Sequence, residues 1–426
     1  MQPRPVQLAE TISRSDYMSG AEALVVLGVK PQTLYSYVSR GLVRRLSIDG
    51  KSCLYHREDI RRLKARSAAR SGHGPVAGGA LHWGEPVLLT GITEVTAGGP
   101  RYRCHLATEL ARSGASFETV AEYLWTGADA GPDTHWAFPS SLARIAPQVS
   151  ALASAYPRLK LRQLLTEILL LLGIEHSQSQ DDPQMIALVD ARTLIQAMCM
   201  AFGFIGSRHA FVEPRKNESI AGYLLRAFGI ETTAARVRVL NAVLVLLADH
   251  EFSPATFAAR IAASSGVDLH SCVGAGLHVH FGSALALRCD RIELALDAPA
   301  PENAPAAEMP VPPLGFRHPL YTDGDPRARL IVELAFTLPD RKDLLEHVLL
   351  TLRRIDNHGG AVSLDSALVA VCRALGFSGL VAGGILAVSR CAGWIAHVFE
   401  QSQQDFMIRP RGKFSPDRSG AGQSAA

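Results

Sequence analysis

The sequence lacks a paired-cysteine motif and an apolar run long enough to cross a membrane. Its seven cysteines are scattered and odd in number, with no CxxC pair, which predicts reduced thiols in a cytoplasmic protein. The N-terminus has no charged-then-apolar signal peptide. The longest apolar runs, 168–174 and 242–248, fall far short of the roughly 18 residues of a spanning helix. We therefore expect buried helices and no membrane contact.

Charge is sparse and unevenly distributed. Only 19% of the 426 residues are charged and 47% are hydrophobic, so the chain can bury a large core in more than one domain. Residues 1–70 hold 13 basic and 6 acidic side chains, whereas the remainder holds 30 and 34. A basic module joined to a mildly acidic body indicates a nucleic-acid partner for the first part.

Residues 17–66 carry the signals of two short helices followed by a hairpin. Ser19 and Glu22 stand in capping-box positions, and Pro31 begins the second helix. A polar hairpin is expected around residues 49–50, with a further helix after it. The turn chemistry, the basic charge and the exposed hydroxyl groups together favour DNA binding.

This module, placed at residues 1–67, resembles the winged helix-turn-helix of the excisionase and mercury-resistance-regulator type. By that resemblance the second helix enters a major groove and the wing approaches phosphates. Such modules also serve as dimerisation or docking domains, which is the alternative. The expected DNA-binding residues are Gln32, Thr33, Tyr35, Tyr37, Arg40, Arg44, Arg45 and Lys51.

Helix signals dominate the rest of the chain, and strand patterns are few and short. Residues 68–80 are small and Gly-rich and predict a linker, residues 298–314 predict a Pro/Ala-rich loop, and 412–426 predict a disordered tail. The fold class is therefore all-α. The clearest helical patterns cover residues 113–127, 161–173, 236–250, 340–355, 364–376 and 387–401.

Histidine, arginine and carboxylate side chains recur in four stretches of this helical body. Arginines present planar donor forks that suit carboxylates, so several of them beside histidines indicate a dicarboxylate or oxoacid ligand. An aspartate near such a set is a candidate base for a carbon-bound proton. Each residue alone is more often a packed histidine or a surface charge. The set comprises His250, His318, Arg327, Asp365, Arg390 and Arg409.

The residues of these stretches and their order along the chain resemble citrate synthase, and more closely the branch with an N-terminal helix-turn-helix. The resemblance covers roughly residues 81–411. It is carried by HWGEPVLLTGIT, FETVAEYLWTG, ADHE with TFAARIAAS, GFRHPLYTDGDPRA, the aspartate helix, AGWIAHVFEQ and IRPR. Together these pieces are highly specific for the family, although no single piece is.

The resemblance implies a citrate synthase-like two-domain helical fold that closes over substrate and forms a homodimer. Residues 81–286 with 371–411 would form the large domain and residues 287–370 the small domain. The expected ligands are oxaloacetate or a similar 2-oxoacid and an acyl-CoA. Acetyl-CoA would be a co-substrate, and no cofactor would be bound permanently.

The resemblance also implies a role for each residue of the set. His250 would hold the oxoacid, and His318 would supply a proton to its ketone oxygen. Asp365 would take a proton from the methyl group of acetyl-CoA. The substrate carboxylates would be clamped by Arg327, Arg390 and, from the partner chain, Arg409.

One segment departs from the family pattern. The family carries an enol-stabilising histidine in a GPxHGG motif, but here Leu285 takes its place. Ungapped alignment keeps Gly282, whereas Ser283, Ala286 and Leu287 replace the proline and the two glycines. Leucine donates no hydrogen bond to an oxyanion, and losing one such donor costs roughly 100- to 1000-fold in rate.

Nearby histidines do not repair this departure. His278 and His280 precede the lost position by seven and five residues, which is about 10.5 and 7.5 Å of helical rise. Their HxH spacing suggests a metal, but no carboxylate or cysteine stands at ligand spacing, so we expect packed histidines and no metal site. The sequence predicts a citrate synthase-like transferase with reduced or altered activity. The alternatives are a DNA-binding regulator that senses an oxoacid, and a paralogue that only assembles with an active synthase.

Overall fold

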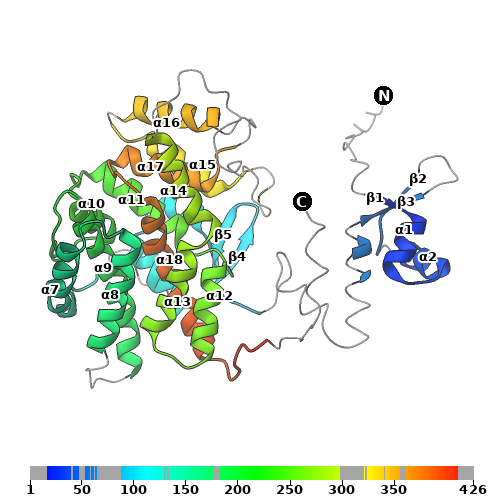
Figure 1. The fold of residues 1–426 in the computed structure, drawn as a ribbon, viewed down its shortest axis with the longest axis horizontal. Helices are drawn as coiled ribbons and strands as arrows, with labels where there is room; N and C mark the ends of the chain where they lie inside the picture. Colours follow the sequence, from blue (N-terminus) through cyan, green and yellow to red (C-terminus); the bar gives the residue numbers. More distant parts are fainter. Residues whose placement is uncertain are drawn as a thin grey trace. The chain divides into compact units, whose positions relative to one another are not determined.

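Helices dominate the computed structural model of the chain (Figure 1). The chain forms two compact units, one of residues 1–89 with 410–426 and the other of residues 90–409. The structure describes residues 17–39, 42–47, 53–57, 59–61, 63–64, 88–128, 131, 134–176, 183–297, 321, 324–339, 341–355 and 361–410.

Among its described residues, the first unit combines short helices with a small antiparallel sheet of order β1-β3-β2. Its elements are β1 (Tyr17–Ser19), α1 (Gly20–Leu27), α2 (Pro31–Ser39), β2 (Arg45–Ser47) and β3 (Cys53–His56). The predicted capping box of α1 is confirmed: Ser19 Oγ accepts from the Glu22 amide, and Glu22 Oε2 accepts from the Ser19 amide at 2.8 Å. Gly28 ends the helix at a φ of 64°, a conformation that glycine adopts without steric cost.

The two strands of the predicted hairpin are present as the β2–β3 pair, in which Leu46 lies opposite Leu54, and the turn at residues 49–50 lies outside the described residues. Residues 57, 59–61 and 63–64 are helical. A small core of Met18, Ala23, Leu27, Leu34, Val43, Tyr55, Ile60 and Leu63 holds these elements together.

The second unit begins with a short sheet and continues almost wholly as helix. The strands are β4 (Thr93–Thr96), β5 (Gly99–Tyr102) and β6 (His105–Leu106). The helices are α5 (Ala107–Ser113), α6 (Phe117–Thr126), α7 (Ser140–Ala155), α8 (Leu161–His176), α9 (Pro183–Ile205), α10 (Ile220–Phe228), α11 (Ala234–Leu247), α12 (Pro254–Ser264), α13 (Leu269–Phe281), α14 (Ala284–Asp297), α15 (Pro326–Ala335), α16 (Lys342–Ile355), α17 (Leu364–Leu375) and α18 (Ala382–Ser402).

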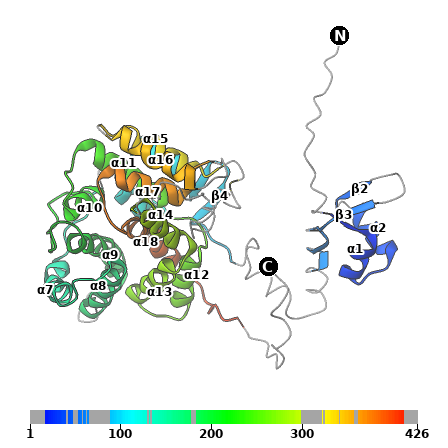
Figure 2. The same cartoon turned by 45° about the horizontal axis from the view of Figure 1, so that its top comes forward.

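All six clear helical patterns of the sequence correspond to helices, namely α6, α8, α11, α16, α17 and α18. Helix α18 runs through the middle of this unit and packs against α6, α9, α11, α12, α13 and α14 (Figures 1 and 2). Helices α15 and α16 pack against α17 at one end of the unit.

The two longest apolar runs behave differently. Residues 242–248 of α11 are fully buried, as expected. Residues 168–174 of α8 are only partly buried, because Leu170 and Ile174 are 60% and 55% exposed. The expectation of burial was therefore wrong for one face of α8. Spacing of four residues places these two side chains on the same face of a helix, and the core covers only the opposite face.

Two helices, at Ala187–Ile205 and Ala382–Ser402, are long and apolar enough to cross a membrane by length and composition. The sequence prediction missed them because it considered only uninterrupted apolar runs, and small and polar residues interrupt the apolar residues of these helices. Their apolar windows are 72% and 94% buried within the protein, which fits core helices. The domain boundaries within residues 81–411 stay predictions, and the predicted linker, Pro/Ala-rich loop and tail lie outside the described residues.

Candidate functional site

The loop after α11 places His250 at the surface of the helical core. Tyr102 of β5 anchors the end of the helix, because its hydroxyl donates to the Val245 carbonyl at 2.9 Å. The Gly393 amide of α18 donates to the Ala248 carbonyl at 3.0 Å. Glu251 then turns the chain through a φ of 54°, a left-handed conformation uncommon for residues other than glycine.

A buried network of ionisable side chains supports the loop that carries His250. Asp249 is fully buried, and its Oδ2 lies 3.2 Å from His397 Nε2. His397 Nδ1 lies 3.2 Å from Arg260 Nη1, and the same nitrogen of Arg260 pairs with Glu400. Burial opposes ionisation of Asp249, but His397 and Arg390 outweigh it and lower the pKa of its carboxyl group. The loop therefore rests on an ionised aspartate.

Tyr321 connects the predicted site residues. Its hydroxyl lies 3.0 Å from His250 Nε2, and the guanidinium carbon of Arg327 lies 5.7 Å from the centre of its ring. Burial raises the pKa of Tyr321 to about 12, although the charge of Arg327 opposes the rise. The phenol stays neutral, so it can donate one hydrogen bond and accept another.

Arg327 is fixed at the start of α15 by a residue of its own turn. Asp325 caps the helix by accepting from the Arg327 amide at 2.9 Å. Its two oxygens also accept from Arg327 Nε at 3.0 Å and from Nη2 at 2.6 Å. Burial would lower the pKa of the guanidinium, but the Asp325 carboxylate raises it above the usual value.

Within the part of the chain that the structure describes, one donor group of Arg327 is uncommitted. The side chain is 2% exposed, and among the described residues its Nη1 has no hydrogen-bond partner. A buried guanidinium nitrogen without a partner is costly, and an anion would satisfy it.

Arg390 of α18 belongs to the same cluster. It is 6% exposed, and its Nε donates to the Leu247 carbonyl at 2.9 Å, beside the loop of His250. Burial lowers its pKa, and the charge of Arg327 adds to the effect, whereas Asp249 opposes it. The structure thus brings together three residues predicted from the sequence: His250, Arg327 and Arg390.

Comparison with known proteins gives this cluster its context. The family profile "Citrate synthase, C-terminal domain" matches residues 80–411. The chain belongs to the citrate synthase family.

Several relatives of this citrate synthase family member show the breadth of the match. "Citrate synthase 2" of Bacillus subtilis is 27% identical over 280 residues, covering 63% of this chain and 75% of that protein. A 2-methylcitrate synthase of Mycobacterium tuberculosis is 27% identical over 329 residues, covering 72% and 82%. The citrate synthase of Thermoplasma acidophilum, solved with carboxymethyl coenzyme A and oxaloacetate, matches with a TM-score of 0.62 at 20% identity, covering 78% and 94%. The citrate synthase-like fold predicted from the sequence is confirmed.

Asp365, the predicted base, lies in the first turn of α17, behind the Ser363 cap. It is fully buried, and its Oδ2 accepts from Arg288 Nε at 2.5 Å. Arg288 lies on α14, three residues after Leu285, which is half-buried against the core. In this member of the family, the carboxylate therefore has an arginine partner that the sequence analysis did not foresee.

The remaining predicted residues of this family member have different settings. His318 lies outside the described residues, and Arg409 is exposed beyond the end of α18. His280 is buried and its Nε2 lies 3.0 Å from the Gly383 carbonyl, which confirms the expectation of a packed histidine. His278 is exposed instead, with its Nδ1 2.7 Å from the Gly274 carbonyl of its own helix.

The predicted DNA-binding residues also differ in setting. Gln32 and Tyr35 of α2 are exposed, whereas Tyr37 packs against the small core. Arg44 is bound by Asp59, with Nε to Oδ2 at 2.9 Å, so its charge is already countered. Thr33 is half-buried, Arg45 is exposed, and Arg40 and Lys51 lie outside the described residues.

Sequence reasoning found candidate site residues, but it missed the neighbouring residues that position them. Asp325, two residues before Arg327, had a readable signal, because an aspartate before proline at a helix start is a cap. Tyr321 lies in the same loop motif as His318 and was not assigned a role. Asp249, His397 and Arg288 had no local signal, since their partners lie far away in the sequence.

Proposed function

We propose that this chain condenses a short acyl-CoA, such as acetyl-CoA, with oxaloacetate or a similar 2-oxoacid. The observation that carries the proposal is Nη1 of Arg327, which is buried and has no hydrogen-bond partner among the described residues, in the cluster that also holds His250 and Arg390. Guanidinium forks at a desolvated site suit a carboxylate. The Thermoplasma relative, solved with oxaloacetate and carboxymethyl coenzyme A, supports the same pair of ligands.

The proposed chemistry follows from the roles that the family resemblance implies. Asp365 removes a proton from the methyl group of acetyl-CoA, and the enol carbon attacks the ketone carbon of the oxoacid. His318 donates a proton to the ketone oxygen, and hydrolysis of the thioester then releases CoA. His250, Arg327 and Arg390, with Arg409 of a partner chain, hold the oxoacid. No permanently bound cofactor takes part.

Two features reduce the expected rate. Leu285 supplies no donor to the enol oxygen, a loss of roughly 100- to 1000-fold. Arg288 forms an ion pair with Asp365, and this ion pair must break before the carboxylate can accept a proton. Arg288→Ala is therefore expected to raise the rate of CoA release. A fall in that rate would instead make Arg288 part of the machinery.

The test is CoA release by the purified full-length chain with a panel of oxoacids and with acetyl-CoA or propionyl-CoA. Propionyl-CoA is included because 2-methylcitrate synthases are among the relatives. Asp365→Ala is the reference variant, and it should abolish the signal. Release no faster than that of Asp365→Ala with every pair would refute the enzymatic function.

A DNA-binding regulator that senses an oxoacid is the second candidate, and it too includes the winged helix-turn-helix assignment of residues 1–67. The basic charge of residues 1–70 and the exposed Gln32, Tyr35 and Arg45 favour it. Calorimetric binding of oxaloacetate or citrate without turnover, together with DNA retention at moderate salt, would support it. Failure of either measurement would remove it.

A homodimer in the cytoplasm is the proposed assembly. The exposed Leu170 and Ile174 on one face of α8 support it, because a second copy could cover them. Sedimentation of the full chain tests it, and a monomer at all concentrations would also leave Arg409 without its proposed role.

A further inference from the structure

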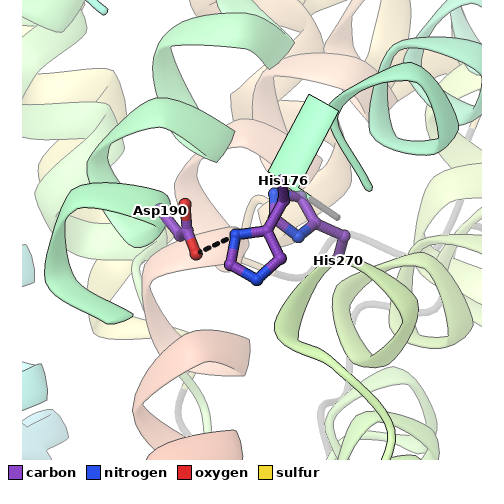
Figure 3. A group of neighbouring side chains, drawn as sticks. All are labelled: His176, Asp190 and His270. Carbon is purple, nitrogen blue, oxygen red and sulfur yellow. Dashed lines mark ion pairs between the residues drawn. The ribbon is translucent and has the colours of Figure 1, made fainter. Parts of the chain in front are cut away.

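A cluster of metal-binding side chain types lies on the helical body, on helices that hold none of the described residues of the acyl-transfer site. His176 ends α8, Asp190 lies in α9, and His270 lies in the first turn of α13 (Figure 3). One ligand atom from each residue lies within 4.8 Å of the other two. We propose that these three residues form a zinc-binding site.

The donor spacing is close to what Zn²⁺ requires. Histidine nitrogens and carboxylate oxygens bind zinc at about 2.0–2.2 Å, which places two donors roughly 3–3.6 Å apart. His176 Nδ1 already lies 2.9 Å from Asp190 Oδ2. The third donor must move inward by about 1 Å, which a rotation of one side chain provides.

His270 supplies the second, independent observation. The residue is 5% exposed, and among the described residues its Nδ1 is buried without a hydrogen-bond partner. Its ring lies beside that of His176, with the centroids 5.2 Å apart (Figure 3). A buried imidazole nitrogen without a partner is uncommon, because its desolvation is not compensated. A metal ion, or a carboxylate that shifts on metal binding, would compensate it.

The charge of the surroundings suits a divalent cation. Asp268 caps α13, and its Oδ1 lies 3.7 Å from His270 Nδ1. A carboxylate next to a metal-binding histidine orients the ring and increases its basicity.

The site is partly open to solvent. Zinc with three protein ligands completes its coordination with solvent. The side chains of His176 and Asp190 are 31% and 16% exposed, so the cluster is reachable from outside.

The experiment titrates the untagged, chelator-treated full chain with Zn²⁺ against a chromophoric competitor, and follows Co²⁺ binding by its visible absorption. One ion per chain is expected, with cobalt bands of low coordination number and no thiolate charge transfer. The absence of thiolate charge-transfer absorption matters because the exposed Cys104 could also bind zinc. His176→Gln and Asp190→Asn leave the buried His270 unchanged, and each should weaken binding at least tenfold.

Two further variants sharpen the result. Asp268→Asn should weaken zinc binding about 10- to 100-fold, as outer-shell carboxylates do. His278→Gln is the matched control, because His278 is an exposed histidine of α13, the helix that holds His270. The zinc affinity of this variant should equal that of the wild type. Absence of stoichiometric zinc, or affinity unchanged in Asp190→Asn, would overturn the proposal and leave a plain histidine–aspartate ion pair.

Discussion

Arg327→Met tests whether the arginine proposed to bind the oxoacid is also a structural element. Arg327 and Asp325 are 2% and 6% exposed and share two side-chain hydrogen bonds. Removing one member of such a buried pair costs about 3–5 kcal/mol of unfolding free energy. Met fills a similar volume, so the loss of packing is small.

The assay is urea unfolding at fixed protein concentration, with Arg329→Met as the matched control on the exposed side of the same helix. The control should change stability by less than about 0.5 kcal/mol. The double variant with Asp325→Asn should recover about 2 kcal/mol or more, because both members of the buried ion pair are then neutral while Asn still caps α15.

Binding provides the second measurement. Calorimetry should show oxaloacetate affinity reduced about 10- to 100-fold in Arg327→Met, since hydrogen bonds to charged groups are worth about 1.5–3 kcal/mol. An Arg327→Met variant as stable as Arg329→Met, or a double variant no better than the single one, would refute the buried-pair reasoning.

Three further predictions concern other parts of the chain. Burial raises the pKa of Glu293 to about 8 against a usual 4.5, so the stability that depends on its protonated form is present at low pH and is lost as pH rises towards 8. Compared with the wild type, Glu293→Gln should gain up to a few kcal/mol of unfolding free energy at pH 8 and little at pH 5. Equal gains at both pH values would contradict this prediction. Leu285→His with Ala286→Gly and Leu287→Gly should raise CoA release, and no gain in the turnover assay would mean that the site has diverged further. Arg45→Ala should weaken DNA retention and reduce the slope of log affinity against log salt by about one, whereas an unchanged slope would exclude a phosphate contact.

Local patterns predicted the helices well. The apolar spacing in 236–250 and 387–401 and the capping box at Ser19 depend only on neighbouring residues, and the structure places helices or a cap at each. The half-exposed α8 was missed because a run of leucines does not reveal which face a neighbouring helix covers.

The candidate site was predictable as a set of residue types and not as a set of contacts. The resemblance selected His250, Arg327 and Arg390, which do lie together. The contact between Arg288 and Asp365 spans 77 positions, and no local period encodes it. The same reason hides the three residues of the proposed zinc site, which come from three different helices.

The missing side chain of Gly393 has a consequence for variation in this protein. A methyl group there would lie 2.2 Å from Asp249 Oδ1 and 2.6 Å from the Ala248 carbonyl oxygen, closer than atoms tolerate. Even alanine would have to push the segment that carries His250 away from α18. Random mutagenesis should therefore recover inactive variants at a position that contacts no ligand, and a screen focused on the pocket lining would overlook it.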